Sequence, residues 1–126
     1  MEKQLTAVIL GAGSRGRAYA DEMLQMPRRF RVVAVAEPSP GRRSYIRSRH
    51  ALPESACFDD WRGLLAKGKL ADVAVIATMD RDHFAPVLAA IELGYDLLLE
   101  KPIAPTAEEC LKITEAAENA GVRVLV

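Results

Sequence analysis

The chain alternates between short, mainly apolar runs and longer stretches in which apolar residues recur every three or four positions. Short apolar runs bounded by glycine, proline or charged residues are typical of strands buried on both faces of a parallel sheet. Apolar residues at helical spacing predict amphipathic helices that cover such a sheet. The predicted strands are residues 5–10, 30–36, 56–58, 73–77, 96–99 and 122–126.

The predicted helices have start and stop signals in the sequence. Ser39 can cap a helix that has Pro40 at its first position, and Asp60 can cap the helix after the third strand. Thr106 and Glu109 have the spacing of a capping box, in which each satisfies the other's helix-end N–H group. The predicted helices are residues 17–25, 40–50, 61–66, 107–120 and a segment that starts at 82–85 and ends at Gly94.

Alternation of strands and helices over the whole chain predicts an α/β fold. We expect three layers, with helices on both faces of a doubly wound parallel sheet and right-handed crossovers between the strands. Together with the glycine-rich turn at residues 11–16, this alternation predicts the strand order 3-2-1-4-5-6, so the switch point falls between strands 1 and 4. Three loops should therefore meet at one cleft, namely residues 11–16, 78–83 and 100–102.

A glycine-rich turn joins the first strand to the first helix, with the sequence Gly11-Ala12-Gly13-Ser14-Arg15-Gly16. In a G-x-G-x-x-G turn the first glycine permits the sharp bend, the second leaves room for a pyrophosphate, and the third lets the helix pack closely. The helix start offers N–H groups and a positive dipole end to the phosphates. A Walker loop would instead require Lys and then Ser or Thr, where this chain has Arg17 and Ala18. The turn therefore predicts a bound dinucleotide.

Glu37 ends the second strand, about 20 positions beyond Gly16, where a carboxylate can accept hydrogen bonds from the adenosine ribose hydroxyls. The same charge would repel a 2′-phosphate at about 4 Å by an energy on the order of several kcal/mol at an effective dielectric constant near 20. Arg42 or Arg43 could offset that repulsion. The sequence therefore predicts NAD as the preferred cofactor and leaves NADP open.

Composition narrows the class of partners. The chain has 126 residues, with 17 Lys and Arg against 17 Asp and Glu, so the absence of net charge gives no support for a nucleic acid or an anionic membrane as partner. Cys57 and Cys110 lack the spacing of a metal site, and we expect buried free thiols in a reducing cytoplasm. The first apolar run is too short for a signal peptide, and no later run could span a membrane.

Two residues at the expected cleft have less specific signals. Lys101 follows the fifth strand, near the nicotinamide end of a bound dinucleotide, but a lysine at a strand end is about as often a solvated surface charge. His83 lies at the start of a helix that faces the same cleft, and a histidine there more often only helps to hold the helix start. Trp61 shares a helix face with Leu64 and Leu65, which favours a place in the core.

Four segments together resemble the Gfo/Idh/MocA family, which contains glucose–fructose oxidoreductase, inositol dehydrogenase and rhizopine-catabolism proteins. The segments are Gly11–Gly16, Glu37-Pro38, Ala77-Thr78 to His83, and Gly94 to Glu100-Lys101-Pro102. The resemblance covers essentially the whole chain, and Glu-Lys-Pro after the fifth strand is its most specific part. The chain differs at Met79, where the family often has proline.

The resemblance implies roles for several residues. Lys101 would hydrogen-bond the substrate or the nicotinamide near the reacting centre and is the candidate catalytic residue. His83 would line the nicotinamide side, and Pro102 would follow a cis peptide. The residues that we assign to cofactor binding are Gly11, Ala12, Gly13, Ser14, Arg15, Gly16, Glu37, Thr78, His83, Glu100, Lys101 and Pro102. No residue is assigned to a metal.

The resemblance also implies a larger protein. Family members continue into a second α/β domain that supplies the substrate pocket, much of the oligomer interface and a proton-exchanging histidine or aspartate. We therefore expect residues 1–126 to be the dinucleotide-binding domain of a longer, homo-oligomeric and cytoplasmic protein.

The expected activity is hydride transfer between a nicotinamide cofactor and a sugar, a polyol or a related secondary alcohol. Two alternatives stay open: a dinucleotide-binding regulatory module without turnover, and an NAD-dependent glycoside hydrolase of the same family. The residues that would distinguish them lie beyond Val126.

Overall fold

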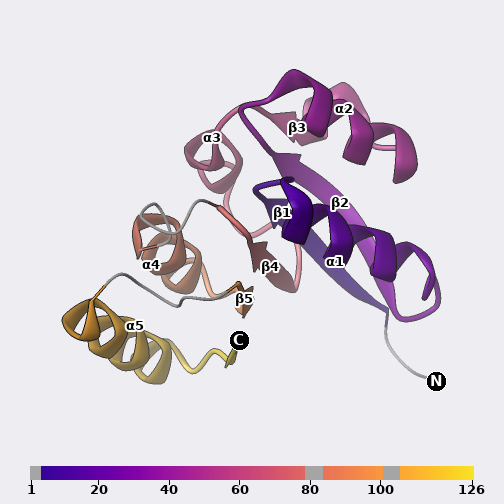
Figure 1. Ribbon diagram of the computed structural model, residues 1–126. Coiled ribbons are helices and arrows are strands. Elements are labelled where there is room, and N and C mark those ends of the chain that lie inside the picture. The colour runs from indigo at the N-terminus through magenta and orange to yellow at the C-terminus, as the bar shows by residue number, and fades with distance from the viewer. Residues whose placement is uncertain (1–3, 79–83, 101–105) are drawn as a thin grey trace.

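The computed structural model describes residues 4–78, 84–100 and 106–126 (Figure 1). Six parallel strands form one sheet in the order β3-β2-β1-β4-β5-β6, which confirms the predicted order. The two edge strands are shorter than predicted, because a 3₁₀ helix, η1 (Glu54–Ala56), precedes β3 and only two residues of the last segment pair. The strands are β1 (Leu5–Leu10), β2 (Phe30–Ala36), β3 (Cys57–Phe58), β4 (Val73–Ile76), β5 (Asp96–Leu99) and β6 (Val124–Leu125).

The helices agree with the predicted caps. The side chains of Ser39, Asp60 and Thr106 each accept a hydrogen bond from a backbone N–H group in the first turn of their helix. The first helix begins at Ser14, earlier than the predicted Arg17, so the second half of the glycine turn is already helical. The helices are α1 (Ser14–Leu24), α2 (Pro40–Arg49), α3 (Trp61–Leu65), α4 (Phe84–Glu92) and α5 (Ala107–Ala120).

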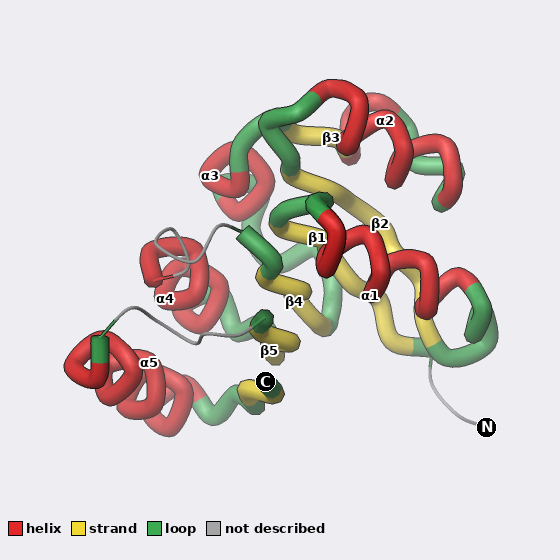
Figure 2. The backbone as a smooth tube through the Cα atoms, in the orientation of Figure 1, coloured by secondary structure: helices red, strands yellow, loops and turns green. Residues whose placement is uncertain are grey.

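The sheet buries both of its faces, as the three-layer prediction requires. Alternate residues of β1 point to opposite faces, so Ala7 and Ile9 pack with α1 and α2, while Val8 and Leu10 pack with α3, α4 and α5. Figure 2 shows the helices around the central strands, with α4 and α5 side by side. Each fully buried leucine or isoleucine contributes roughly 1.5–3 kcal/mol to this packing.

The carboxyl ends of four strands are held at a common edge of the sheet. The ladder continues one residue past the strands, because the N–H groups of Gly11, Glu37, Ala77 and Glu100 each donate to the neighbouring strand or its end, at 2.8–3.0 Å. The switch point lies at this edge, since β1 pairs with both β2 and β4. Strand topology therefore brings the first residues of the three predicted loops, Gly11, Thr78 and Glu100, to the edge of the sheet where a Rossmann fold binds its ligand.

Two further findings concern the composition. Within the described parts of the chain, no helix combines the length and the apolar character needed to cross a membrane. Cys57 and Cys110 are not joined in a disulfide and are half-buried rather than fully buried, and burial raises the pKa of the Cys57 thiol.

Candidate functional site

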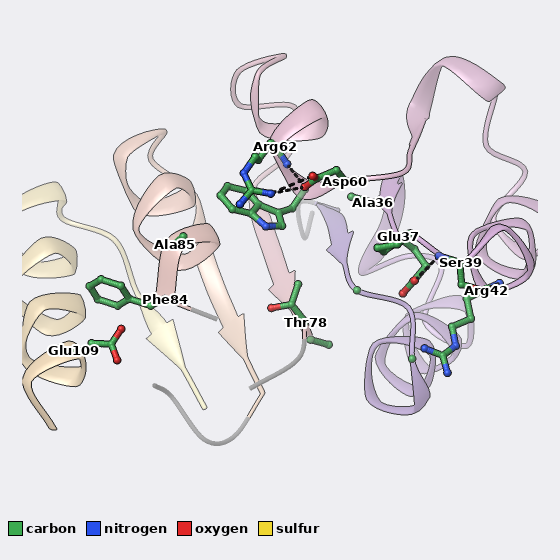
Figure 3. A pocket seen from close by; sticks show the side chains of 15 residues that line it. Ala36, Glu37, Ser39, Arg42, Asp60, Arg62, Thr78, Phe84, Ala85 and Glu109 are labelled. Atoms are coloured by element: carbon green, nitrogen blue, oxygen red, sulfur yellow. Dashed lines mark hydrogen bonds and ion pairs between the residues drawn. The ribbon is translucent and has the colours of Figure 1, made fainter. Parts of the chain in front are cut away.

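A cavity of about 750 Å³ lies along the carboxyl edge of the sheet. Its volume falls in the range of about 300–1,000 Å³ that is usual for small-molecule sites. The glycine turn, the end of β2, the end of β4 and the starts of α3 and α4 all contribute to its lining. Figure 3 shows Glu37 and Arg42 at one end, Thr78 in the middle, and Phe84 and Glu109 at the other end.

The protein's own backbone conformation and packing, rather than a ligand, require glycine at two positions of the turn. Gly11 has a φ of +93°, a conformation that residues with side chains rarely adopt, and a Cβ there would lie 2.6 Å from the carbonyl oxygen of Ala77. A Cβ on Gly16 would lie 1.9 Å from the carbonyl oxygen of Gly11 and 3.3 Å from the Cβ of Ala77. The sequence predicted close packing at Gly16, and the structure identifies the turn itself and the end of β4 as the surfaces that it packs against.

Gly13 differs from these two glycines in the space around it. Apart from its two chain neighbours, the only atom of the described residues within 4 Å of a Cβ placed on Gly13 is Nη1 of Arg42 at 3.7 Å. Gly13 lines the cavity and is the N-cap residue of α1, so this helix start has no side-chain cap. Its first turn also has no acidic residue. The first-turn N–H groups, which have no partner within the helix, are therefore placed to bind an anion.

Glu37 is the only buried residue in the described ranges that is polar or charged, with a relative exposure of 6%. Its Oε1 accepts a hydrogen bond from the N–H group of Ala12 at 2.8 Å, and its Oε2 accepts one from the N–H group of Ser39 at 2.8 Å. Each carboxylate oxygen has more than one acceptor site, so ribose hydroxyls can still donate to the same group. The carboxylate thus ties the glycine turn to the start of α2, a role that the sequence analysis missed.

The two arginines after Glu37 have different surroundings. Arg43 donates through Nη1 to the backbone carbonyl oxygen of Glu37 at 2.6 Å. Arg42 lines the cavity beside Gly13. The sequence left the choice between them open, and the geometry selects Arg42 as the cation that a ligand in the cavity would meet.

Thr78 lies directly after β4 and lines the middle of the cavity. Its hydroxyl oxygen is buried and has no hydrogen-bond partner among the described residues. A buried hydroxyl without a partner is unfavourable by about 1–3 kcal/mol, so an unpaired one next to a cavity fits a ligand that completes its bonding.

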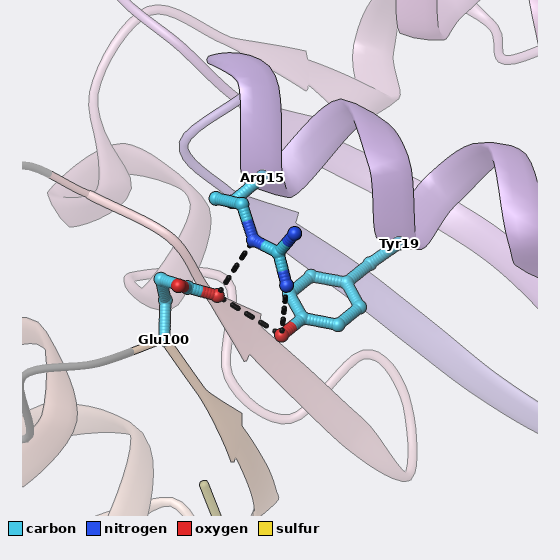
Figure 4. Close-up of polar contacts among 3 residues, drawn as sticks. All are labelled: Arg15, Tyr19 and Glu100. Atoms are coloured by element: carbon cyan, nitrogen blue, oxygen red, sulfur yellow. Dashed lines mark hydrogen bonds and ion pairs between the residues drawn. The ribbon is translucent and has the colours of Figure 1, made fainter.

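Glu100, the first residue of the Glu-Lys-Pro segment, contacts α1 across the sheet edge (Figure 4). Its Oε2 accepts a hydrogen bond from the Tyr19 hydroxyl at 2.9 Å and forms an ion pair with Nε of Arg15 at 3.3 Å. The same two neighbours, Tyr19 first, raise the pKa of the Arg15 guanidinium above its ordinary value. The glycine turn and the segment that leads to Lys101 are therefore joined by side chains.

Trp61 packs against the larger core cluster, as predicted, and also lines the cavity. It is half-buried, and the guanidinium of Arg62 lies 4.5 Å from its ring centroid. Asp60 holds that guanidinium in an ion pair of 3.1 Å. Helical periodicity found the core contact, but no local signal shows that the same ring reaches a cavity.

Three of the predicted site residues, His83, Lys101 and Pro102, lie outside the described residues, as does Met79. In the ranges that the structure does describe, no group of three or more His, Cys, Asp or Glu side chains is arranged to hold a metal ion.

The cavity fits a dinucleotide on three observations of this structure: the open side of Gly13, the uncapped start of α1, and the Thr78 hydroxyl, which has no hydrogen-bond partner among the described residues. Fold and site together define a dinucleotide-binding α/β domain of the Rossmann type. Residues 5–126 match the model of the Gfo/Idh/MocA family, described as an oxidoreductase family with an NAD-binding Rossmann fold. The chain therefore belongs to the Gfo/Idh/MocA oxidoreductase family, as its NAD-binding domain.

Relatives and solved structures agree with this assignment. An inositol 2-dehydrogenase/D-chiro-inositol 3-dehydrogenase from Halalkalibacterium halodurans is 32% identical over 93% of the chain and 33% of its own length. An NAD binding oxidoreductase from Klebsiella pneumoniae is 26% identical over 98% of the chain and 34% of its own, with a TM-score of 0.82. The chain thus spans about a third of the length of the curated relatives that it matches.

The fold extends to more distant proteins. The WlbA dehydrogenase from Chromobacterium violaceum, solved with NADH and UDP-GlcNAcA, has a TM-score of 0.89 at 19% identity. This structure covers 100% of the chain, while the chain covers 36% of it. At that identity the likeness shows the fold alone.

Proposed function

We propose that this chain binds and orients NAD for an oxidoreductase that transfers a hydride between the nicotinamide and a sugar, a polyol or a related secondary alcohol. The observation that carries the proposal is the cavity, which extends from the glycine turn and Glu37 to Thr78 along one edge of the sheet. The substrate class is supported by relatives that are named inositol 2-dehydrogenases.

Different residues along the cavity bind different parts of the cofactor. When NAD is bound, it supplies the hydride chemistry. The N–H groups at the start of α1, next to Gly13, bind the pyrophosphate. Glu37 accepts hydrogen bonds from the adenosine ribose, because its carboxylate is already fixed at the cavity by Ala12 and Ser39. The Thr78 hydroxyl bonds the part of the ligand that lies between β1 and β4.

Lys101 is proposed as the catalytic residue, at the substrate oxygen where charge develops. It directly follows Glu100, whose N–H group continues the sheet ladder at the carboxyl end of β5. A cation that faces developing negative charge lowers the barrier, typically by about 3 kcal/mol for one donor. The role is supported by this sequence position and by the family assignment.

The test replaces Lys101 by alanine in the longer protein and measures turnover beside cofactor affinity. Turnover should fall about 100-fold while the Kd for NADH stays within about 3-fold, because the lost contact is made in the transition state. Lys112→Ala is the matched control, since Lys112 is an exposed lysine on α5 that pairs with Glu108 at 3.5 Å. Turnover within about 3-fold of wild type for the Lys101 variant would contradict the catalytic role.

The wider proposal is that residues 1–126 act as one dinucleotide-binding domain and that another domain of the longer protein supplies the substrate pocket. The chain alone should bind NADH but produce none from NAD and myo-inositol. Steady NADH production by the 126 residues alone would show that no second domain is needed. We further propose a cytoplasmic homo-oligomer, which the family assignment favours.

The same assays separate the two remaining alternatives. A longer protein that binds NADH but turns over neither polyols nor glycosides would be a regulatory module. A longer protein that hydrolyses glycosides only with NAD bound, without net reduction, would be a glycoside hydrolase.

A further inference from the structure

Three side chains bridge the phosphate-binding helix and the end of β5. Arg15, in the first turn of α1, pairs with Glu100 through Nε at 3.3 Å and donates through Nη2 to the Tyr19 hydroxyl at 3.4 Å. Tyr19, one turn further along α1, donates to the same Glu100 oxygen at 2.9 Å. Figure 4 shows the guanidinium of Arg15 in contact with both the carboxylate and the phenol, which also contact each other.

The cation of the bridge is the long, flexible side chain of Arg15, on the helix whose first turn is the proposed site for the pyrophosphate. The Arg15 side chain is 62% exposed, and the first turn of α1 that bears it holds no acidic residue. The contact between Nε and the Glu100 oxygen is longer than the roughly 2.7–2.9 Å of a strong charge-assisted hydrogen bond. An exposed ion pair of this kind is weak, so another anion nearby can compete for the arginine.

We propose that Arg15 exchanges partners when the cofactor binds. Its guanidinium breaks the ion pair with Glu100 and pairs with the pyrophosphate instead, while Tyr19 keeps its hydrogen bond to Glu100. The inference rests on the proposed binding of the dinucleotide at the glycine turn. A guanidinium binds two phosphate oxygens at once and is weakly hydrated, so it gains more from the pyrophosphate than from one carboxylate oxygen. Glu100 is therefore a competitor of the cofactor for the same cation.

The exchange makes the two ends of the bridge act in opposite directions on cofactor affinity. Removing the charge of Arg15 weakens binding, because the pyrophosphate loses a partner. Removing the charge of Glu100 strengthens binding, because Arg15 no longer has to be taken from a partner. A bridge that only holds α1 against β5 would instead weaken binding when either end is changed.

The first experiment measures NADH binding by fluorescence titration at low salt for Arg15→Gln. We expect the Kd to rise about 10-fold, as for the loss of one charge-assisted phosphate contact. Arg17→Gln is the matched control, because Arg17 is an exposed cation on the same helix that lies against Tyr45 at 3.7 Å and near Asp21 at 4.0 Å. The control should stay within about 2-fold, so the general loss of positive charge is accounted for.

The second experiment is a double-mutant cycle with Glu100→Gln. This substitution should lower the Kd for NADH about 3-fold in the wild type and should have no effect once Arg15 is glutamine. A gain that persists in the Arg15→Gln background would overturn the exchange, because it would come from through-space repulsion alone.

A comparison of ADP with adenosine tests whether Arg15 binds the pyrophosphate rather than another part of the cofactor. ADP, which contains a pyrophosphate, should lose affinity in Arg15→Gln, whereas adenosine should not. Thermal unfolding of each variant checks that the fold is kept. The Arg15→Lys variant keeps the positive charge but not the planar guanidinium, so it should recover part of the NADH affinity that is lost in Arg15→Gln.

The outcomes distinguish this inference from the proposed function. Tight NADH binding by the wild type with equal Kd values for Arg15→Gln and Arg17→Gln would overturn the exchange and leave the cofactor assignment in place. Absence of NADH binding by the wild type would overturn both.

Discussion

Two glutamates, each directly after a parallel strand, lie on the same edge of the sheet and are held in different ways. Glu37, after β2, is 6% exposed, and both of its oxygens accept backbone N–H groups at 2.8 Å. Glu100, after β5, has a side chain that is 23% exposed, and the donors to its Oε2 are the side chains of Tyr19 and Arg15. The first carboxylate is fixed by the fold, whereas the second is fixed by residues that can move.

The difference follows from what surrounds each strand end. The glycine turn and the start of α2 flank Glu37 and present N–H groups that no helix or strand uses, so a buried carboxylate is stable there. Glu100 faces the exposed side of α1, where long side chains are the donors. A backbone-held acid suits a permanent ligand contact, and a side-chain-held acid suits an exchange of partners.

The largest expected effect is on stability, and it tests whether the two acids differ as described. Glu37→Ala would leave the buried N–H group of Ala12 and the partly buried N–H group of Ser39 without acceptors, at about 1–3 kcal/mol each, so the free energy of unfolding should fall by about 2–6 kcal/mol. Glu100→Ala should lower it by no more than about 1 kcal/mol, because its contacts are partly exposed. Urea unfolding of both variants measures the two values.

Glu37→Gln sharpens the same comparison. The amide keeps one acceptor oxygen and places an NH₂ group against the other N–H, so the loss should lie between wild type and Glu37→Ala. Equal destabilisation by Glu37→Ala and Glu100→Ala would refute the distinction between the two sites.

The next effect concerns the choice of cofactor at the Glu37 end. NAD should bind about 10-fold more tightly than NADP, because the Glu37 carboxylate repels a 2′-phosphate. Arg42→Ala should weaken NADP binding selectively, since Arg42 lines the cavity beside Gly13. Calorimetry with both cofactors measures the ratio.

Arg43→Ala is the control for this prediction, because Arg43 is bound to the carbonyl oxygen of Glu37. It should change the affinities for the two cofactors equally. Glu37→Ala should narrow the difference between them, measured where that variant is folded. NADP binding as tight as NAD binding by the wild type would mean that Arg42 outweighs the Glu37 carboxylate.

A smaller expected effect, on the affinity for AMP, tests whether the adenosine lies beside Trp61. The chain has one tryptophan, and its ring lines the cavity with Arg62 at 4.5 Å from its centroid. AMP should quench the tryptophan fluorescence, while nicotinamide mononucleotide should leave it unchanged. Trp61→Leu should raise the Kd for AMP about 5-fold, since stacking of a base on an aromatic ring contributes about 1–3 kcal/mol. Quenching by both mononucleotides alike would contradict this placement.

The smallest effect is a pH dependence that belongs to neither glutamate. His50 ends α2, and burial lowers the pKa of its imidazole, although a hydrogen bond to the backbone of Ala20 and the charge of Asp21 act in the opposite direction and Arg49 adds to the lowering. The folded pKa therefore lies below the unfolded value of about 6.5, so the stability is full above that pH and decreases as the pH falls below it.

His50→Gln should flatten this decline between pH 7 and 5 in thermal unfolding. A wild-type stability that stays constant over the same range would refute the prediction. A decline that is unchanged in the variant would assign the proton to another group.

Much of the fold was predictable because its signals are local. Apolar periodicity located the strands and helices, and the caps at Ser39, Asp60 and Thr106 stand where residue types that favour caps occur. The prediction was wrong at the start of α1 and at the edge strands β3 and β6, where two or three residues decide an element's length and pairing with a neighbour outweighs propensity.

The candidate site was predictable only in part. The spacing of the glycine turn and Glu37 predicts a dinucleotide as the ligand, and both line the cavity in the structure. Their contacts with a cofactor stay predictions, as do the roles of His83, Lys101 and Pro102. No pattern in the sequence distinguishes Arg42 from Arg43, because that depends on which way each side chain turns at the start of α2.

The sequence by itself determined the α/β class, the strand order and the family, because periodicity, turn chemistry and motif spacing are properties of neighbouring residues. Only the tertiary structure decided which distant groups meet: Glu37 with the N–H group of Ala12, 25 positions away, and Glu100 with Arg15, 85 positions away. The reason is geometric. Those contacts depend on how the strands align at their carboxyl ends and how α1 docks against them, and these distances are set by the packing of the whole core rather than by any local stretch of the chain.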